Sequence, residues 1–139
     1  MKFLMMIKGN ADSEAGVMPS QEAFAAMTEF NEQLQKAGVL VDLNGLRPTK
    51  DGTRVKFGNG TPTVTNGPFK EDVVAGYWVI KANSLQEAID WAKKVPNDPK
   101  KPGVEGEIEI RQIFELDEFE SGPGIDRARE FEKELTKAR

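Results

Sequence analysis

The 139-residue sequence contains neither histidine nor cysteine. Without cysteine the chain forms no disulfide and offers no thiol nucleophile or iron–sulfur ligand. Without histidine it lacks every site that depends on imidazole, including serine–histidine–aspartate triads and zinc fingers. Any chemistry must therefore use carboxylates, lysine, arginine, tyrosine, hydroxyls or backbone groups. We predict no metal site and no resident cofactor.

A long apolar run and an excess of basic residues are also missing. The longest apolar run is Phe3-Leu4-Met5-Met6-Ile7, whereas a membrane span needs about 20 residues and a signal-peptide core about 7–15. The net charge of −4 argues against non-specific binding to nucleic acid, which needs a basic face. We therefore expect a cytoplasmic protein with no membrane or nucleic-acid partner.

Apolar periodicity and capping signals predict six main elements in the order βαββαβ. The strands are expected at 2–8, 39–46, 73–80 and 107–114, and the helices at 20–37 and 84–95. Short runs at 53–57 and 61–65 around Gly58-Asn59-Gly60 predict a β-hairpin inserted between the second and third strands. The segments 9–18 and 96–106 are predicted loops.

Individual side chains are also assigned by these patterns. The first helix is expected to bury Phe24, Met27, Phe30 and Leu34, and the second Leu85, Ala88, Ile89, Ala92 and Val95. Alternation places Val39, Val41 and Leu43 on one face of the second strand, and turns Ile108, Ile110 and Phe114 of the last strand inward. Ser84 followed by Glu87 predicts a capping box.

The order βαββαβ is the ferredoxin-like arrangement, which has the strand order 4-1-3-2. The first and third strands are apolar on both faces, as the two central strands should be. Two helices cover only one face of such a sheet, so the other face carries an exposed apolar surface and either Tyr77 or Trp78. We predict an α+β fold whose antiparallel sheets pack face to face in a homodimer. Residues 1–119 form the predicted domain, and 120–139 form a charged tail with weak helical periodicity.

Ordered sequence blocks give the chain a family resemblance. They are Gly16-Val17-Met18-Pro19, Ala37-Gly38-Val39-Leu40, Gly45-Leu46-Arg47-Pro48, Arg54-Val55-Lys56-Phe57, Thr65-Asn66-Gly67-Pro68-Phe69, Ala75-Gly76-Tyr77-Trp78, Glu87-Ala88-Ile89-Asp90-Trp91 and Gly106-Glu107-Ile108-Glu109-Ile110-Arg111. From residue 1 to 119 the chain resembles the DGPF branch of the YCII-related proteins. The resemblance implies a dimeric α/β barrel of ferredoxin-like subunits, without a settled activity.

The chain departs from this family in three ways. Asn66 stands where the family motif has aspartate, and the segment after Phe69 is shorter than usual. The family's histidine–aspartate dyad has no counterpart, because the chain has no histidine. Relatives include a cofactor-free dehydrochlorinase, and the wider superfamily includes isomerases and monooxygenases. The genes of related proteins often neighbour those of extracytoplasmic-function sigma factors.

Several residues are candidates for a site, each with a plainer alternative. Glu71 and Asp72 are the candidate catalytic bases, or else solvated loop charges. Asn66 and Phe69 are candidate ligand contacts, although Asn-Gly-Pro is also good turn chemistry. The planar guanidinium groups of Arg47, Arg54 and Arg111 suit a carboxylate or phosphate. Tyr77 either packs in the core or donates its hydroxyl to an oxyanion in the cleft.

Two classes of function remain open at this point. The first is a binding protein that holds a small anionic or phenolic molecule in a cleft at the dimer interface. The second is a cofactor-free acid–base enzyme, such as a lyase, isomerase or dehydrochlorinase, or an accessory protein of a sigma-factor signalling system. The missing histidine and the asparagine at position 66 favour binding, because an amide does not titrate near neutral pH.

Overall fold

The structure, a computed structural model, describes residues 1–97 and 106–138. Its strands and longer helices follow the predicted order: β1 (Lys2–Lys8), α2 (Gln21–Lys36), β2 (Leu40–Gly45), β3 (Thr53–Lys56), β4 (Thr63–Asn66), β5 (Val74–Lys81), α3 (Leu85–Ala92) and β6 (Ile108–Gln112). The fold also contains a short helix α1 (Ala11–Glu14) and a 3₁₀ turn at Thr49–Asp51. A second 3₁₀ turn at Leu116–Glu118 and helix α4 (Pro123–Ala138) lie at the C-terminal end. Most of the predicted loop 96–106 lies outside the described residues.

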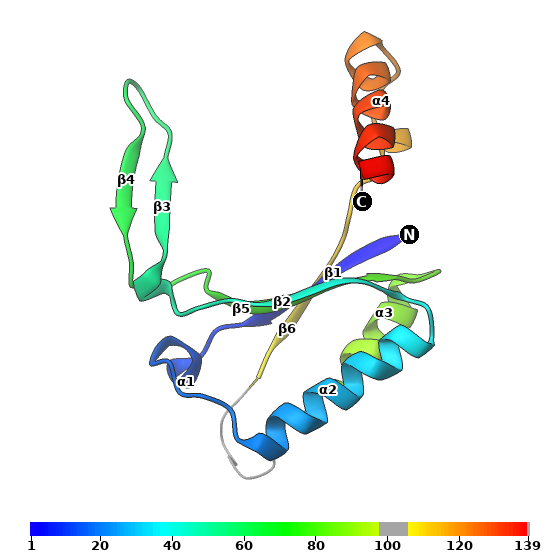
Figure 1. Cartoon of the computed structure of the whole chain (residues 1–139). Coiled ribbons are helices and arrows are strands. Elements are labelled where there is room, and N and C mark those ends of the chain that lie inside the picture. The colour runs from blue at the N-terminus through cyan, green and yellow to red at the C-terminus, as the bar shows by residue number, and fades with distance from the viewer. Residues whose placement is uncertain (98–105, 139) are drawn as a thin grey trace.

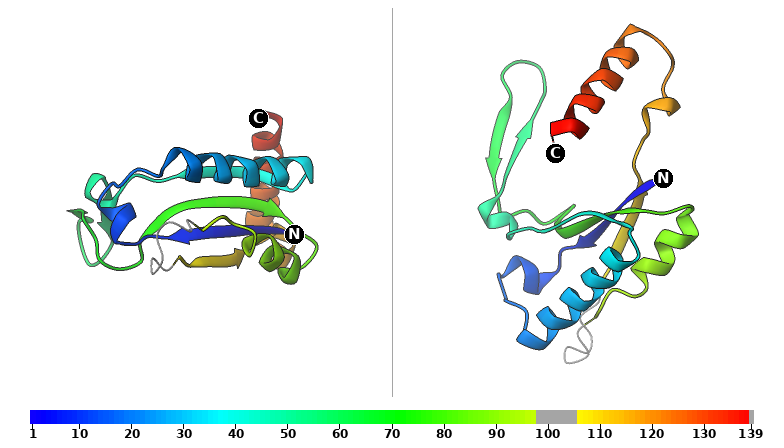
Figure 2. Two further views of the ribbon diagram at one scale, coloured as in Figure 1. Left: turned by 90° about the horizontal axis from the view of Figure 1, so that it is seen from below. Right: turned by 45° about the vertical axis from the view of Figure 1, so that its right-hand side comes forward.

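The main sheet has four strands in the order β2-β5-β1-β6, and each neighbouring pair is antiparallel. This confirms the predicted ferredoxin-like α+β fold, with the first and third main strands in the centre. Helices α2 and α3 lie on one face of the sheet (Figure 1). The other face, here named the open face, is not covered by either of these helices (Figure 2).

The core lies between the sheet and these two helices. Its buried side chains are Phe3, Met5, Phe30, Leu34, Trp78, Ile80, Ala82 and Ala88. The rings of Phe30 and Trp78 meet edge to face with their centroids 5.5 Å apart, and the indole Nε1–H of Trp78 donates to Asn31 Oδ1 at 2.8 Å. Trp78 is therefore the aromatic residue on the helix side, and its neighbour Tyr77 is on the open face.

Serine side chains cap both long helices as the sequence predicts. The Ser20 hydroxyl accepts from the Ala23 N–H, and the Ser84 hydroxyl accepts from the Glu87 N–H. The reciprocal half of the predicted Ser84–Glu87 capping box differs, because the Glu87 carboxylate accepts from the Asn83 N–H rather than from that of Ser84. Helix α2 ends at Lys36, and Gly38, the residue after the C-cap Ala37, has a φ of +73° that suits a residue without a side chain.

One predicted loop is wrong over part of its length. Residues 11–14 form helix α1, because Asn10 and Ser13 build a reciprocal capping box at its start. The Asn10 side chain accepts from the Ser13 N–H, and the Ser13 hydroxyl accepts from the Asn10 N–H, each at 2.9 Å. A single polar turn has no apolar stripe, so hydrophobic periodicity alone does not detect it.

Four apolar side chains predicted to be inside are exposed. A β-bulge between Leu40 and Asp42 makes Val41 the extra residue, so Leu40 and Leu43 face the core instead. Leu85 is the first residue of α3, where its side chain lies beyond the packed turns. Phe24 is 58% exposed at the rim of a hollow, and Phe114, 71% exposed, lies past the end of β6.

Two elements project from the body on the side of the open face. Strands β3 and β4 pair as the predicted hairpin, with Val55 opposite Val64, and every residue in them is exposed. Helix α4 rises at the other end of the sheet (Figures 1 and 2) and has no buried residue. Among the described residues, no helix is both long and apolar enough to cross a membrane.

Candidate functional site

The Asn66–Phe69 motif begins the connection from the hairpin to β5 and is anchored by backbone contacts. The Gly67 N–H donates to the Gly52 carbonyl at 2.9 Å, and the Phe69 N–H donates to the Thr49 hydroxyl at 2.8 Å. The Gly67-Pro68 peptide bond is cis. The backbone of the motif is therefore held against residues 49–52, at the foot of the hairpin.

Glu14 extends this anchor to the N-terminal part of the chain. Its carboxylate accepts from both the backbone N–H and the hydroxyl of Thr49. The Thr49 hydroxyl thus donates to Glu14 and accepts from Phe69 in a continuous chain of hydrogen bonds. This network joins helix α1 to the loop that carries Phe69.

Arg54, Phe69 and Glu71 are brought together by the fold. The Arg54 guanidinium carbon lies 4.0 Å from the centroid of the Phe69 ring, which is a cation–π geometry. Its Nη2 donates to the backbone carbonyl of Glu71 at 2.7 Å. No carboxylate within residues 1–97 and 106–138 forms an ion pair with Arg54, so the positive charge is held in place without being neutralised there.

A hollow of about 690 Å³ is lined in part by the loop that carries Phe69. Of the predicted site residues, Phe69 and Asp72 contribute to its walls, whereas Glu71 does not. Its other charged residues are Lys8, Glu14, Lys70 and Glu107. Asp72 has a positive φ of 57°, an uncommon conformation for a residue with a side chain. Both Glu71 and Asp72 are exposed.

Tyr77 forms a separate polar group on the open face. Its hydroxyl accepts from the Asn44 side-chain amide at 2.9 Å and lies 3.4 Å from an oxygen of Asp42, to which it donates. Asn44 lies directly across from Tyr77 on β2, because the two strands pair in this register. The Tyr77 hydroxyl is thus already oriented by its neighbours.

The remaining predicted residues are dispersed. The Asn66 side-chain carbonyl accepts from the Thr53 hydroxyl at 3.0 Å, across the end of the hairpin. Arg47 forms an exposed ion pair with Asp51, with 3.2 Å between Nε and Oδ2. Arg111 lies opposite Leu4, on the open face. The structure therefore groups Arg54, Phe69 and Glu71, with Asp72 close by in sequence, and places the other four elsewhere.

Glu14 and Thr49 were not predicted from the sequence. Both lie in short polar segments, and their contact joins residues 35 positions apart, so no local pattern links them. The Asn10–Ser13 capping box was the one available signal, since it locates the short helix that ends at Glu14.

A second, mainly apolar hollow of about 580 Å³ lies between the N-terminal half of α2 and the end of β2. Phe24, Met27 and Leu43 line it, and none of the eight predicted site residues does. In the described part of the chain, no group of three or more acidic side chains is placed to hold a metal ion.

Comparison with known proteins gives one clear result. The profile of the YCII-related domain matches residues 1–117. A comparison with curated proteins finds no match. The matched residues include the sheet, helices α2 and α3, the hairpin and every predicted site residue, but they end before helix α4.

Proposed function

Because the chain belongs to the YCII-related family, we propose that it is a binding protein for a small anionic or phenolic molecule. The ligand binds at the foot of the hairpin, against Arg54 and Phe69. The proposal needs no histidine dyad and no cofactor. The Asn-Gly-Pro-Phe motif further supports a place in the DGPF branch, and a cytoplasmic location fits the absence of cysteine.

The state of Arg54 is the observation that carries this proposal. A guanidinium group has five N–H donors in a fixed plane, and one nitrogen of Arg54 is used by the Glu71 carbonyl. The Phe69 ring under the guanidinium fixes its plane. The donors left over match the two oxygens of a carboxylate, and the ring edge beside them suits a flat apolar group.

The proposal also includes a second copy of the chain, packed on the open face. Leu4, Met6 and Val79 form an apolar, half-buried strip along the middle of the open face. Another sheet packed against this strip would remove it from water, at a gain of about 25 cal/mol for each Å² of apolar surface. The Tyr77 hydroxyl lies on this face, so in such a homodimer it would face the space between the sheets.

Acid–base catalysis is a second candidate, and one observation favours it. Asp72 lines the same hollow as Lys8 and Lys70, and ammonium groups there would stabilise the negative charge that develops on a ligand as a carboxylate removes its proton. In this alternative Asp72 would act as the base on a ligand seated beside Phe69.

The test compares two arginine variants, using salicylate, benzoate and inorganic phosphate as probes. Arg54→Gln should weaken binding of salicylate at least about 10-fold, since a charged hydrogen bond contributes about 1.5–3 kcal/mol. Arg47→Gln is the matched control, because Arg47 is exposed and paired with Asp51, and it should bind like the native chain. Calorimetric titration measures both.

Two results would contradict the proposal. One is equal salicylate affinity in both variants, and the other is no binding of any of the three probes by the native chain. Nuclear magnetic resonance spectra of each probe, recorded after long incubation, test the alternative. New signals that disappear in Asp72→Asn would establish turnover in place of simple binding.

A further inference from the structure

The hairpin presents one apolar face that nothing in the described structure covers. Val55 and Val64 lie directly opposite each other, and Phe57, two residues beyond Val55, falls on the same side by alternation. All three are exposed, Phe57 by 78%. Arg54 and Lys56 project from the opposite face. A two-stranded hairpin is only marginally stable alone, so this apolar face needs a partner surface.

The C-terminal arm, residues 114–138, is also apolar along one side. In α4 the residues Ala128, Phe131 and Leu135 are spaced by three and four positions, which aligns them in one stripe. Phe131 is 61% exposed and Leu135 is exposed as well. In the segment that precedes α4, the rings of Phe114 and Phe119 contact each other with centroids 5.0 Å apart.

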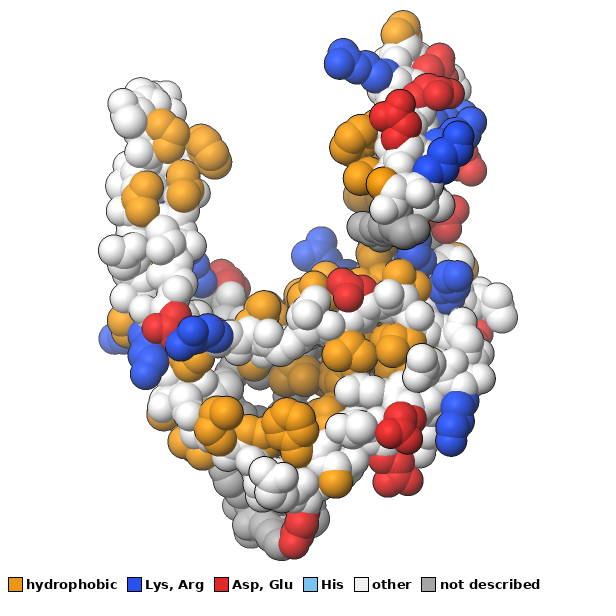
Figure 3. Space-filling view, viewed as in Figure 1, with side chains coloured by type: hydrophobic (Ala, Val, Ile, Leu, Met, Phe, Trp, Pro, Cys, Tyr) orange, Lys and Arg blue, Asp and Glu red, His pale blue; other side chains and the backbone are white. Residues whose placement is uncertain are grey.

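These two apolar surfaces do not cover each other within one chain. The hairpin and α4 rise from opposite ends of the sheet, with open space between them (Figure 1). Apolar side chains gather on the hairpin and on the side of α4 turned toward it (Figure 3). An occupant of this space would therefore meet apolar side chains on the hairpin, on the open face and on the arm.

A second copy of the chain fits this space in two symmetric ways. Two sheets facing each other are related by a two-fold axis that runs parallel to them. For one direction of the axis, each hairpin meets the partner's hairpin and each arm meets the partner's arm. For the perpendicular direction, each hairpin meets the partner's arm.

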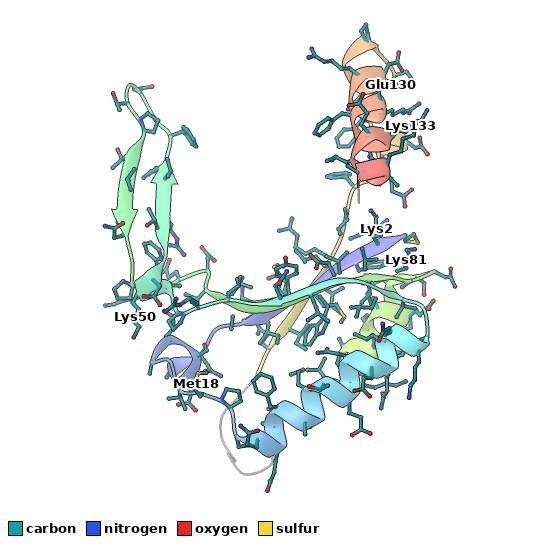
Figure 4. The ribbon with its side chains drawn as sticks, viewed as in Figure 1. Lys2, Met18, Lys50, Lys81, Glu130 and Lys133 are labelled. Atoms are coloured by element: carbon teal, nitrogen blue, oxygen red, sulfur yellow. The ribbon has the colours of Figure 1, made fainter. Side chains whose placement is uncertain are left out.

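Charge distinguishes these two arrangements. The hairpin, residues 53–66, has two basic side chains and no acidic one. The arm has eight acidic and four basic side chains, and its segment 114–120 has four acids and no base. Lys2 and Lys81 lie at the end of the sheet beneath the arm (Figure 4). The acidic side chains of the arm still outnumber the basic ones when these two lysines are added to the count. Like charges would meet in the first arrangement and opposite charges in the second.

We propose that two copies of this chain clasp each other, with the hairpin of each docked by Val55, Phe57 and Val64 on the other's C-terminal arm. The partner surface is the stripe of Phe131 and Leu135 together with the Phe114–Phe119 pair. Most of the arm, including Phe119, Phe131 and Leu135, is therefore a dimerisation element added beyond the matched family domain, which ends at residue 117. This inference rests on the dimer of the proposed function but not on its ligand.

Cysteine cross-linking tests the clasp directly, because the native chain has no cysteine. The double variant Val64→Cys/Leu135→Cys, treated with a short bismaleimide, should run as a covalent dimer on a denaturing gel. Each single variant should remain mainly a monomer on the same gel. The matched control is Thr65→Cys/Lys133→Cys, whose cysteines lie on the outward faces of the hairpin and helix and should cross-link much less.

Light scattering on the untreated native chain completes the experiment. A dimer in solution with hairpin-to-arm cross-links supports the clasp. Strong cross-linking of Val64→Cys to itself would overturn it in favour of the hairpin-to-hairpin arrangement, and so would a dimer in which the double variant fails to cross-link. A monomer at micromolar concentration would overturn both the clasp and the proposed dimer, whereas the salicylate titration reports on Arg54 separately.

Discussion

Replacing Gly67 by alanine should destabilise the protein strongly, although the change adds only one methyl group. A Cβ atom at this position would lie 1.8 Å from the Thr49 carbonyl oxygen and 2.6 Å from its carbonyl carbon. Ordinary contacts of a Cβ atom begin at about 3.4 Å. Both partners are backbone, so no flexible side chain can rotate away, and one of the two chain segments must move.

Hydrogen bonds set the size of the effect. The Thr49 carbonyl accepts from the Gly52 N–H at 2.9 Å, and Gly67 donates to Gly52 at the same distance. The Thr49 hydroxyl also accepts from Phe69 at 2.8 Å. Separating the two segments disrupts the two bonds that join them, from Gly67 to Gly52 and from Phe69 to Thr49, each with a net contribution of about 1 kcal/mol. We therefore expect a loss of about 2 kcal/mol in the free energy of unfolding.

Urea denaturation, followed by tryptophan fluorescence at a fixed protein concentration, measures this loss. The midpoint should fall by roughly 1 M or more, since the dependence on urea is about 1–3 kcal/mol per M. Gly58→Ala is the matched control, because Gly58 lies in the same hairpin with nothing within 4 Å of its added Cβ. Its effect should be below about 1 kcal/mol. Equal midpoints for the two variants would refute the steric reasoning.

Two further predictions concern the core. Leu34→Ala should lower the free energy of unfolding by about 2–5 kcal/mol, because Leu34 is fully buried. Phe24→Ala, at an exposed position of the same helix, should lower it by less than about 1 kcal/mol. Similar urea midpoints for the two variants would contradict the assigned core. Trp78→Phe removes the hydrogen bond to Asn31 and should cost about 1–3 kcal/mol, while Trp91→Phe should cost less, because no hydrogen bond from Trp91 is found in the described residues. Thermal unfolding of the two tryptophan variants measures this difference, and a larger loss for Trp91→Phe would count against the role given to Asn31.

The sheet could be predicted from the sequence because its central strands have an unambiguous pattern. Phe3 and Met5 face the helices while Leu4 and Met6 face the opposite side, so β1 is apolar in both directions and belongs in the middle. Ser20, Ser84 and Gly38 marked helix ends by local chemistry. Signals of this kind depend only on neighbouring residues, so they can be recognised in a single sequence.

The bulge at Val41 and the site network could not be predicted in the same way. Strict alternation assigned Val41 to the core, and only pairing with β5 reveals the extra residue. The contacts of Thr49 with Glu14 and Phe69 depend on how three loops meet. The sequence singles out Arg54, Phe69 and Glu71 for three separate reasons, and no local pattern predicts that they contact one another.

The backbone hydrogen bond between Gly52 and Gly67 closes the hairpin at its foot. The chain thus leaves the body and returns to it at almost the same point, and the strands on either side keep their own pairing with β5 and β1. The hairpin is therefore an insertion whose pairing is independent of the main sheet. Lengthening, shortening or exchanging the residues between 52 and 67 should therefore leave the register of the main sheet unchanged, so the fold can vary the reach of the hairpin independently of its core.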